Sequence, residues 1–245
     1  MAHIKEHAEF DLNSPLLVEG LPGVGLVGKI ATDHLVETFE MEEFASCHCD
    51  GLARTAVYEE GDRAVRPPVR IYADEQRNLL ALQSDVPVSP ESAPEFASCI
   101  TGWLAENDVL PVYLSGLPAE KADVPEMYGV GVGPAQDRLE SHNIDTPTEG
   151  GMISGPTGAL LAEAQQQSFP AIGFVVQANA QFPDPEAARV VLVDGIEPLL
   201  STDIDTDKLL DQAEEIAAAR EKLAQRMQNA NQQESSQAKP LGMYQ

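Results

Sequence analysis

The stretch Leu17-Val-Glu-Gly-Leu-Pro-Gly-Val-Gly-Leu-Val-Gly-Lys29 decides how this chain folds near its N-terminus. Residues 15–19 are mostly apolar and predict a short strand, and the run from Gly20 to Gly28 predicts a tight turn. The residues from Leu26 to Phe39 then favour a helix. A strand that leads through a glycine turn into a helix is typical of layered α/β domains.

The glycines of this turn match a pattern used by dinucleotide-binding proteins. Gly23, Gly25 and Gly28 have the G-x-G-x-x-G spacing, directly after a strand and at the start of a helix. Asp50 follows about twenty residues later, where such proteins carry an acidic residue for the ribose. The turn is therefore a candidate nucleotide site.

A second phosphate-binding pattern is incomplete, and a structural interpretation competes with both. Lys29 fits the lysine of a P-loop, but Ile30 stands where that loop needs a Ser or Thr for magnesium. Alternatively, Gly20, Pro22 and the later glycines only allow a tight turn and close packing of the helix on the sheet. The sequence leaves both the ligand turn and the structural turn open.

Strand and helix patterns alternate through the rest of the first two hundred residues or so. Further strands are expected at 44–48, 53–58, 69–73, 79–86, 109–115 and 171–177, and helices at 90–107, 157–167 and 185–200. The Gly- and Pro-rich residues 120–158 predict long loops. We expect a three-layer α/β/α sandwich around a mostly parallel or mixed sheet, preceded by a polar lead-in at 1–14 and spanning 15–204.

The C-terminal part has a different character. Residues 205–229 predict a long helix with apolar residues at helical spacing, and 230–245 begin as a polar tether. The chain then turns apolar again in Pro240-Leu-Gly-Met-Tyr-Gln245. This apolar ending has three explanations: it arises by chance, it folds back onto its own domain, or it is a tethered peptide ligand with a tyrosine and a free carboxylate.

Charge composition excludes some classes of partner. The chain has 15 Lys and Arg against 40 Asp and Glu, a formal net charge of −25. Phosphate repulsion makes nucleic acid a poor partner. Acidic residues spread along the whole chain suggest a protein adapted to molar salt, where the Debye length of about 3 Å screens self-repulsion.

We find no apolar run long enough to cross a membrane and no apolar signal core, so a cytoplasmic location is expected.

The cysteines and histidines give weak signals. Cys47, Cys49 and Cys99 do not form a disulfide framework at this length and are expected to be small thiols in a reducing interior. On a strand, His48 would point away from Cys47 and Cys49, which argues against a metal site. The serines that precede glycines lack the G-x-S-x-G pattern of hydrolases.

Several motifs resemble those of the proteasome assembly chaperone 2 family. They are the 17–29 stretch quoted above, Leu114-Ser-Gly-Leu-Pro118, Gly151-Met-Ile-Ser-Gly-Pro-Thr-Gly-Ala-Leu-Leu161, and the residues from Asp184 towards Leu200. The resemblance covers roughly residues 15–225. It implies a three-layer α/β/α fold similar in outline to the nucleoside phosphorylases.

The resemblance also implies a role for the last three residues, because archaeal relatives can end in a hydrophobic-Tyr-any motif. Met243, Tyr244 and Gln245 fit it. By that resemblance, Met243 fills an apolar niche between α-subunits of the proteasome core particle, Tyr244 wedges at the subunit seam, and the Gln245 carboxylate pairs with a lysine. We therefore expect a non-catalytic homo-oligomer that binds the α-subunit ring without a cofactor. The alternative is a nucleotide-binding enzyme or sensor, of ATP-grasp or dinucleotide type, that uses Gly23 to Lys29.

Overall fold

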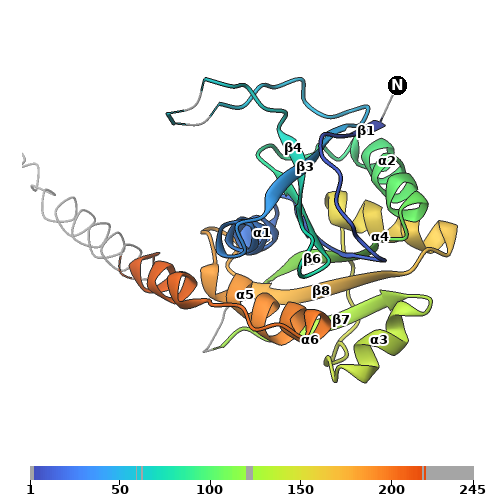
Figure 1. The fold of residues 1–245 in the computed structure, drawn as a ribbon. Helices are drawn as coiled ribbons and strands as arrows, with labels where there is room; N and C mark the ends of the chain where they lie inside the picture. The colour runs from blue at the N-terminus through green and yellow to red at the C-terminus, as the bar shows by residue number, and fades with distance from the viewer. Residues whose placement is uncertain (1–2, 59, 62, 120–123, 217, 219–245) are drawn as a thin grey trace, which may run out of the picture.

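A single mixed sheet forms the centre of the computed structural model, which describes residues 3–58, 60, 61, 63–119, 124–216 and 218 (Figure 1). Its strands are β1 (His3–Glu6), β2 (Leu16–Gly20), β3 (Glu42–His48), β4 (Val69–Asp74), β5 (Leu79–Ser84), β6 (Leu110–Pro118), β7 (Met127–Val132) and β8 (Ala171–Ala178). They lie in the order β1-β3-β4-β5-β2-β6-β8-β7.

The four central strands are parallel and the outer pairs are antiparallel. β2 pairs in parallel with β5 and β6, and β6 pairs in parallel with β8. β7 runs antiparallel to β8, while β4, β3 and β1 extend the other side of the sheet with antiparallel pairing. The carboxyl ends of β2, β6 and β8 therefore meet at one edge of the sheet.

Helices cover both faces of the sheet, which confirms the predicted α/β sandwich. On one face lie α1 (Val27–Thr38), α3 (Ala135–Ser141), α5 (Pro185–Val190), the π-helical turn η2 (Val191–Ile196) and α6 (Glu197–Leu200). On the other lie α2 (Ala93–Glu106) and α4 (Gly155–Gln167). The helix expected at 185–200 is thus present, with its middle turn wound as a π-helix.

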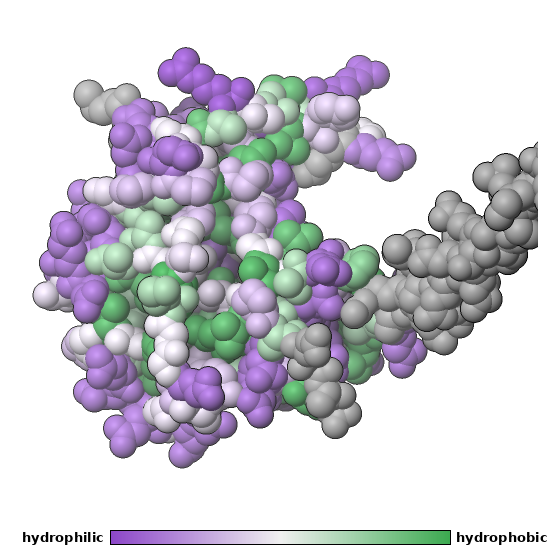
Figure 2. All heavy atoms as spheres, turned by 180° about the vertical axis from the view of Figure 1, so that it is seen from behind, coloured by the Kyte–Doolittle hydropathy of each residue, from purple (hydrophilic) through white to green (hydrophobic). Residues whose placement is uncertain are grey.

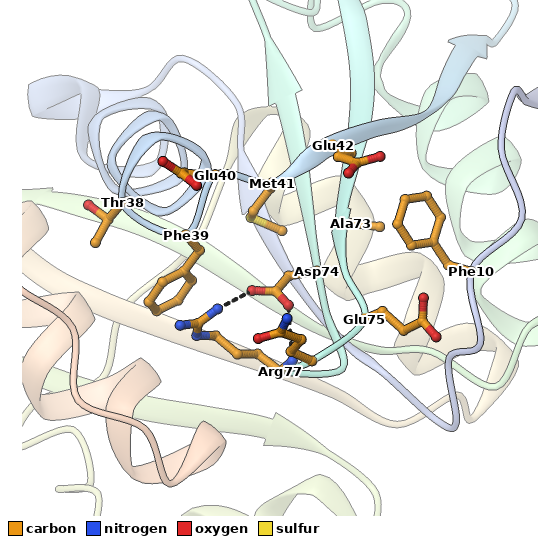
Figure 3. A pocket seen from close by; sticks show the side chains of 11 residues that line it. Phe10, Thr38, Phe39, Glu40, Met41, Glu42, Ala73, Asp74, Glu75 and Arg77 are labelled. Carbon is orange, nitrogen blue, oxygen red and sulfur yellow. Dashed lines mark hydrogen bonds and ion pairs between the residues drawn. The ribbon is translucent and has the colours of Figure 1, made fainter.

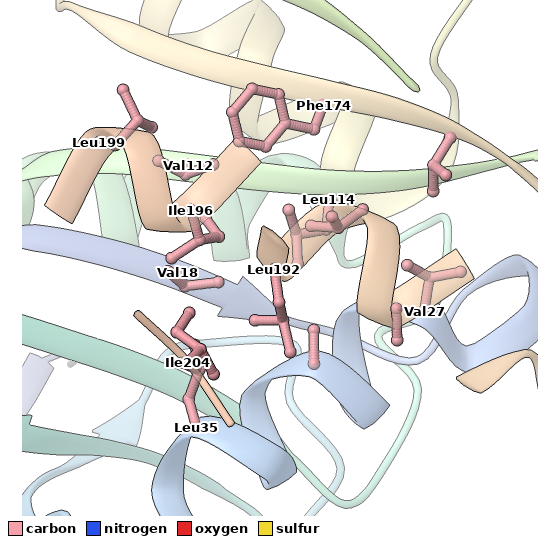
Figure 4. Close-up of a cluster of buried hydrophobic side chains, with 14 of the residues drawn as sticks. Val18, Val27, Leu35, Val112, Leu114, Phe174, Leu192, Ile196, Leu199 and Ile204 are labelled. Atoms are coloured by element: carbon pink, nitrogen blue, oxygen red, sulfur yellow. The ribbon is translucent and has the colours of Figure 1, made fainter. Parts of the chain in front are cut away.

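Each face has its own hydrophobic core. Figure 4 shows the core on the α1 side, where Leu35 of α1 and Leu192 of η2 lie against Val18, Val112 and Phe174 of the sheet. All of these side chains are buried. The alternation of side chains along each strand sends the next residues, such as Leu17 and Tyr113, to the core under α2 and α4.

Three segments differ from the sequence prediction. Residues 53–58 form no strand and make only one isolated bridge, between Val57 and Arg66, in the extended arm at the top of Figure 1. The loop-rich 120–158 contains β7 and α3. The glycines of β7 obscured its strand pattern. A Cβ on Gly129 would lie 2.7 Å from Ile144 Cγ2, so the absence of a side chain there lets the segment that follows α3 pack on β7. The expected lead-in at 1–14 includes β1.

The outer surface is rich in hydrophilic side chains. Figure 2 shows them concentrated around the periphery of one face, with apolar patches between them. Within the described part of the chain, no helix is both long enough and apolar enough to cross a bilayer.

Candidate functional site

The glycine turn lies at the carboxyl edge of the sheet. Gly20 is the last residue of β2, Pro22 and Gly23 form the connection, Gly25 lies in the short 3-10 turn Val24–Leu26, and Gly28 and Lys29 belong to the first turn of α1. The structure thus brings the predicted turn residues together between β2 and α1. In open α/β sheets this edge is where ligands usually bind.

Close packing explains the first glycine of the turn. A Cβ on Gly20 would lie 1.9 Å from Thr32 Oγ1 of α1, an impossible distance. Thr32 Oγ1 in turn donates a hydrogen bond to the carbonyl oxygen of Gly28 at 3.0 Å. A Cβ on Gly23 would meet no atom within 4 Å. Gly20 therefore allows the helix to approach the strand, as the structural interpretation of the turn expects.

A buried carboxylate takes up backbone donors at the turn. Glu19 is fully buried, and its Oε1 accepts a hydrogen bond from the Leu21 amide at 2.8 Å. Its Oε2 accepts from the Leu114 amide of β6 at 3.0 Å and from Thr157 Oγ1 of α4 at 3.4 Å. Burial raises the pKa of this carboxyl to about 7, although both backbone hydrogen bonds act to lower it.

Glu19 changes what the turn can do. A phosphate bound at a strand-to-helix turn needs free backbone amides and positive potential. Here the Leu21 and Leu114 amides already donate to Glu19, and a carboxylate beside the site opposes a second anion. The geometry therefore favours a structural turn over a phosphate cradle.

Lys29 forms ion pairs with carboxylates of its own chain. Its Nζ lies 2.9 Å from Asp33 Oδ2 and 3.5 Å from Asp85 Oδ1. Asp85 Oδ2 also pairs with Nη1 of the buried Arg70 at 2.8 Å, and Gln83 donates to Asp33 Oδ1 at 2.6 Å. The lysine thus belongs to an ion-pair network between α1 and the β4–β5 pair, and its charge is already balanced.

The acidic residue of the dinucleotide pattern is also displaced. In that pattern the second strand lies beside the first, so that its terminal carboxylate reaches the ribose. Here β3, which precedes Asp50, is separated from β2 by β4 and β5 and pairs antiparallel to β4. Asp50 has the spacing in the sequence that the dinucleotide pattern requires, but the strand order places it away from the turn.

A large hollow lies at the other end of the strands, away from the glycine turn, and Figure 3 shows its lining. The hollow, about 810 Å³ in volume, is formed where α1 ends and where β4 turns into β5. Among the described residues that line it, the one cation is Arg77, which lies 4.0 Å over the ring of Phe39 and pairs with Asp74 at 2.6 Å. Because the lining supplies its own cation, we assign this hollow no ligand.

Comparison with known proteins identifies the family of this chain. The sequence profile of the PAC2 family matches residues 17–224. This chain belongs to the PAC2 family. An uncharacterized protein of Methanocaldococcus jannaschii is 27% identical over 222 residues, which is 90% of each chain. A second uncharacterized protein of that organism is 28% identical over 186 residues, covering 74% of this chain and 72% of its own.

Solved structures agree with this PAC2 fold. Pyrococcus furiosus PbaA, described as an archaeal homolog of proteasome-assembly chaperone, matches with a TM-score of 0.76 at 24% identity over 96% of this chain and 97% of its own. PbaB of the same organism, described as an archaeal proteasome activator, has a TM-score of 0.76 at 22% identity over 91% and 98%. These likenesses confirm the α/β fold.

The predicted binding tail of this PAC2 protein, Met243, Tyr244 and Gln245, lies outside the described residues. The described helix that precedes it, at 207–216, begins against α1. Leu209 is buried in the α1-side core, Lys208 pairs with Glu37, and His34 Nε2 donates to the Asp205 carbonyl oxygen at 2.6 Å. The start of this helix is thus fixed to the domain.

The expectation of free thiols is corrected for two cysteines. Cys49 and Cys99 form a disulfide between the end of β3 and α2, with their Cα atoms 5.8 Å apart, while Cys47 is a buried thiol. The two residues are 50 positions apart in the sequence, so only the fold reveals that they meet. His48 is exposed between two buried cysteines, as predicted, and the described residues hold no cluster suited to a metal ion.

Sequence reasoning missed Glu19 as a functional group of the turn. The signal that could have indicated it is a glutamate near the end of an otherwise apolar strand, because a buried acid needs specific donors. The identity of those donors, one of them on β6 and another on α4, depends on the tertiary structure.

Proposed function

We propose that this PAC2 protein binds the proteasome core particle and acts as an assembly chaperone or as an ATP-independent activator or adaptor, without catalysis. The supporting observation is its membership of the PAC2 family over residues 17–224. PbaA and PbaB, which share its fold over nearly the whole chain, are described as a homolog of a proteasome-assembly chaperone and as a proteasome activator.

In this proposal the contact is made by the tail. Met243 and Tyr244 enter a pocket between neighbouring α-subunits, and the carboxylate of Gln245 pairs with a lysine there. The anchored start of the 207–216 helix gives the tail a fixed point of departure from the domain. A homo-oligomer would present several tails to a ring of equivalent pockets and gain avidity from their effective concentration.

The alternative, a nucleotide-binding enzyme or sensor, draws less support from the turn. The Leu21 amide of the turn donates to Glu19, Lys29 is balanced by Asp33 and Asp85, and Asp50 lies beyond β4 and β5. The proposal therefore includes no cofactor. It places the protein in the cytoplasm, where it would meet the core particle.

A pull-down with the cognate core particle in molar KCl tests the proposal. We expect the parent protein to bind, and Tyr244→Ala and a variant with one glycine added after Gln245 to lose binding. Tyr58→Ala is the matched control, since Tyr58 is an exposed tyrosine on the arm, 81% accessible. Binding that survives both tail changes would reject the tail as the contact, and failure of the parent protein to bind would reject the proposed function.

A peptidase assay on the assembled core particle then separates the two modes of action. An activator accelerates cleavage of a short fluorogenic peptide, because occupied pockets open the gate, and Tyr244→Ala removes the acceleration. An assembly chaperone leaves the assembled particle unchanged but increases the yield of rings from isolated α- and β-subunits.

A further inference from the structure

One face of the sheet carries an uncovered apolar groove near β7. The groove is about 460 Å³ in volume, and we call it the β7 groove. Its apolar lining comes from β6, β7, β8 and the loop before α4, namely Leu117, Tyr128, Val130, Val175, Met152 and Ile153. In Figure 1, β7 and β8 lie side by side at this end of the sheet.

The groove exists because α4 covers only part of its face. Leu160 and Ala164 of α4 are buried in the same core cluster as Tyr113 and Ala171. The helix begins at Gly155, so the carboxyl ends of β6 and β8 extend beyond it. There Leu117 remains 44% exposed, and Met152 in the preceding loop is 98% exposed. Covering an apolar patch of this kind with a partner is favourable, because apolar surface is removed from water.

The charge around the groove limits what can cover it. Its described lining includes two acidic residues, Glu126 and Glu149, and no basic residue. Glu126 Oε2 accepts hydrogen bonds from Tyr128 Oη and, at 3.1 Å, from Gln177 Nε2, so this carboxylate is held at the rim. The occupant should therefore combine apolar side chains with a positive charge.

The C-terminal segment of this chain has that composition. Residues 1–218 contain 11 Lys and Arg against 38 Asp and Glu, a net charge of −27. Residues 219–245 contain 4 against 2, a net charge of +2. The folded part of a second copy would bring mostly carboxylates to the groove, whereas this segment brings Lys239 followed by Leu241, Met243 and Tyr244.

The segment is also long enough to reach the groove. The described chain ends at residue 218. With residues 219–229 in the predicted helix and 230–239 extended, the chain spans about 50 Å from there to Lys239. A domain of this size has a radius of gyration of about 17 Å and is about 45 Å across, so the span is comparable with the width of the domain. In an extended peptide, Leu241 and Met243 point to the same side.

We propose that the segment from Lys239 to Tyr244 binds in the β7 groove of its own chain. Leu241 and Met243 pack on Leu117 and Val175 beneath Met152, and Lys239 lies at the acidic rim. Pro240 favours the extended conformation that this needs at Lys239. A tethered segment competes well for such a site, because its effective concentration is in the millimolar range.

Docking of this segment has a regulatory consequence, which rests on the proposed function. Met243 and Tyr244 are the residues proposed to enter the core particle, so the docked tail is unavailable to it. Binding to the proteasome then requires release of the tail from the groove, and changes that weaken the groove should strengthen core-particle binding.

Thiol protection tests the docking in the full chain. Met152→Cys places a reactive thiol over the groove, and its modification by a maleimide is measured under non-reducing conditions, with the parent protein as the blank. We expect modification at least threefold slower than in the same variant carrying Leu241→Glu and Met243→Glu. Val65→Cys is the control, because Val65 lies on the arm, is 72% exposed and should react equally with either tail.

Equal rates for the Met152→Cys thiol with either tail would overturn the docking. A rate that varies with protein concentration would overturn docking within one chain, because the tail would then come from another copy. A separate arm uses Met152→Glu, for which we expect core-particle binding several-fold tighter than for the parent. Unchanged affinity would overturn the inhibitory role, whereas slow modification of the Met152→Cys thiol with no core-particle binding by any variant would reject only the proposed function.

Discussion

Gly20 and Gly23 belong to the same strand-to-helix turn but have different surroundings. Gly20 faces Thr32 across the strand–helix contact, and a Cβ there would overlap the hydroxyl. Gly23 has an extended backbone, with φ −143°, and a Cβ on it would have no atom within 4 Å. Of the two, only Gly20 is required by packing.

Alanine substitutions should separate the two glycines. We expect Gly20→Ala to lower the free energy of unfolding by about 1–3 kcal/mol, the usual cost of overpacking. Gly23→Ala should change it by no more than about 0.5 kcal/mol. Denaturant titration of both variants in molar KCl measures this, and equal losses of stability would contradict the packing explanation.

Glu19 makes stability depend on pH. Its pKa of about 7 in the folded state lies above the value of 4.5 for an unburied glutamate, so the folded state holds the extra proton between these values. The free energy of unfolding should therefore fall as pH rises from about 4.5 to about 7, by up to about 3 kcal/mol, and this contribution is constant above that range.

Substitution of Glu19 isolates its contribution to the pH dependence. Glu19→Gln should flatten the decline in stability between pH 5 and 7.5, because the amide carries no charge. The matched control is Glu106→Gln, at the exposed end of α2, which should keep the parent slope. Thermal unfolding at several pH values gives the three curves. Parallel curves for Glu19→Gln and the parent would show that Glu19 does not titrate in this range.

At the scale of elements, the disulfide between Cys49 and Cys99 ties the end of β3 to α2. The connection from β3 to β4 is the long arm of Figure 1, and this bond anchors its first residues to the domain. The loop that it closes spans 50 positions, for which chain entropy predicts a stabilisation of about 4 kcal/mol.

Reduction should therefore destabilise the protein. We expect dithiothreitol to lower the melting temperature of the parent and of Cys47→Ala, which keeps the disulfide. Cys99→Ser should melt at a lower temperature that does not respond to dithiothreitol. A parent protein that is equally insensitive to the reductant would mean that the two cysteines are unpaired in solution.

At the scale of the whole molecule, the net charge of −25 is the dominant property. Acidic residues are spread along the chain, so their mutual repulsion acts on the folded domain as a whole. The pairs of Lys29 with Asp33 and Asp85, and of Arg70 with Asp85, offset only a small part of it.

We expect the melting temperature to rise by several degrees between 0.1 M and 3 M KCl. The Debye length shrinks from about 10 Å at 0.1 M to about 3 Å at 1 M, so repulsion between surface carboxylates is screened. Calorimetry in KCl, compared with sucrose of equal osmolality, separates screening from the general effect of a solute. An unchanged melting temperature in KCl would reject adaptation to high salt.

Local sequence patterns were enough to predict the α/β class and most of the strands and helices that form the sheet and its two helical layers. Apolar runs such as that of β8 and helical periodicity such as that of α2 are local properties, and local patterns suffice to predict them. Glycines obscured β7, whose stability comes from pairing with β8 and packing of α3 and not from its own propensity.

The role of the glycine turn, in contrast, depends on long-range contacts. The donors to Glu19, the carboxylates around Lys29, the position of β3 and the partner of Cys49 all come from residues distant in the sequence. Such contacts depend on the order of strands in the sheet, which the strand patterns of one sequence do not specify. The tail motif could be read from the sequence because it is a short linear segment, whereas the groove proposed to hold it is made by three strands and a loop.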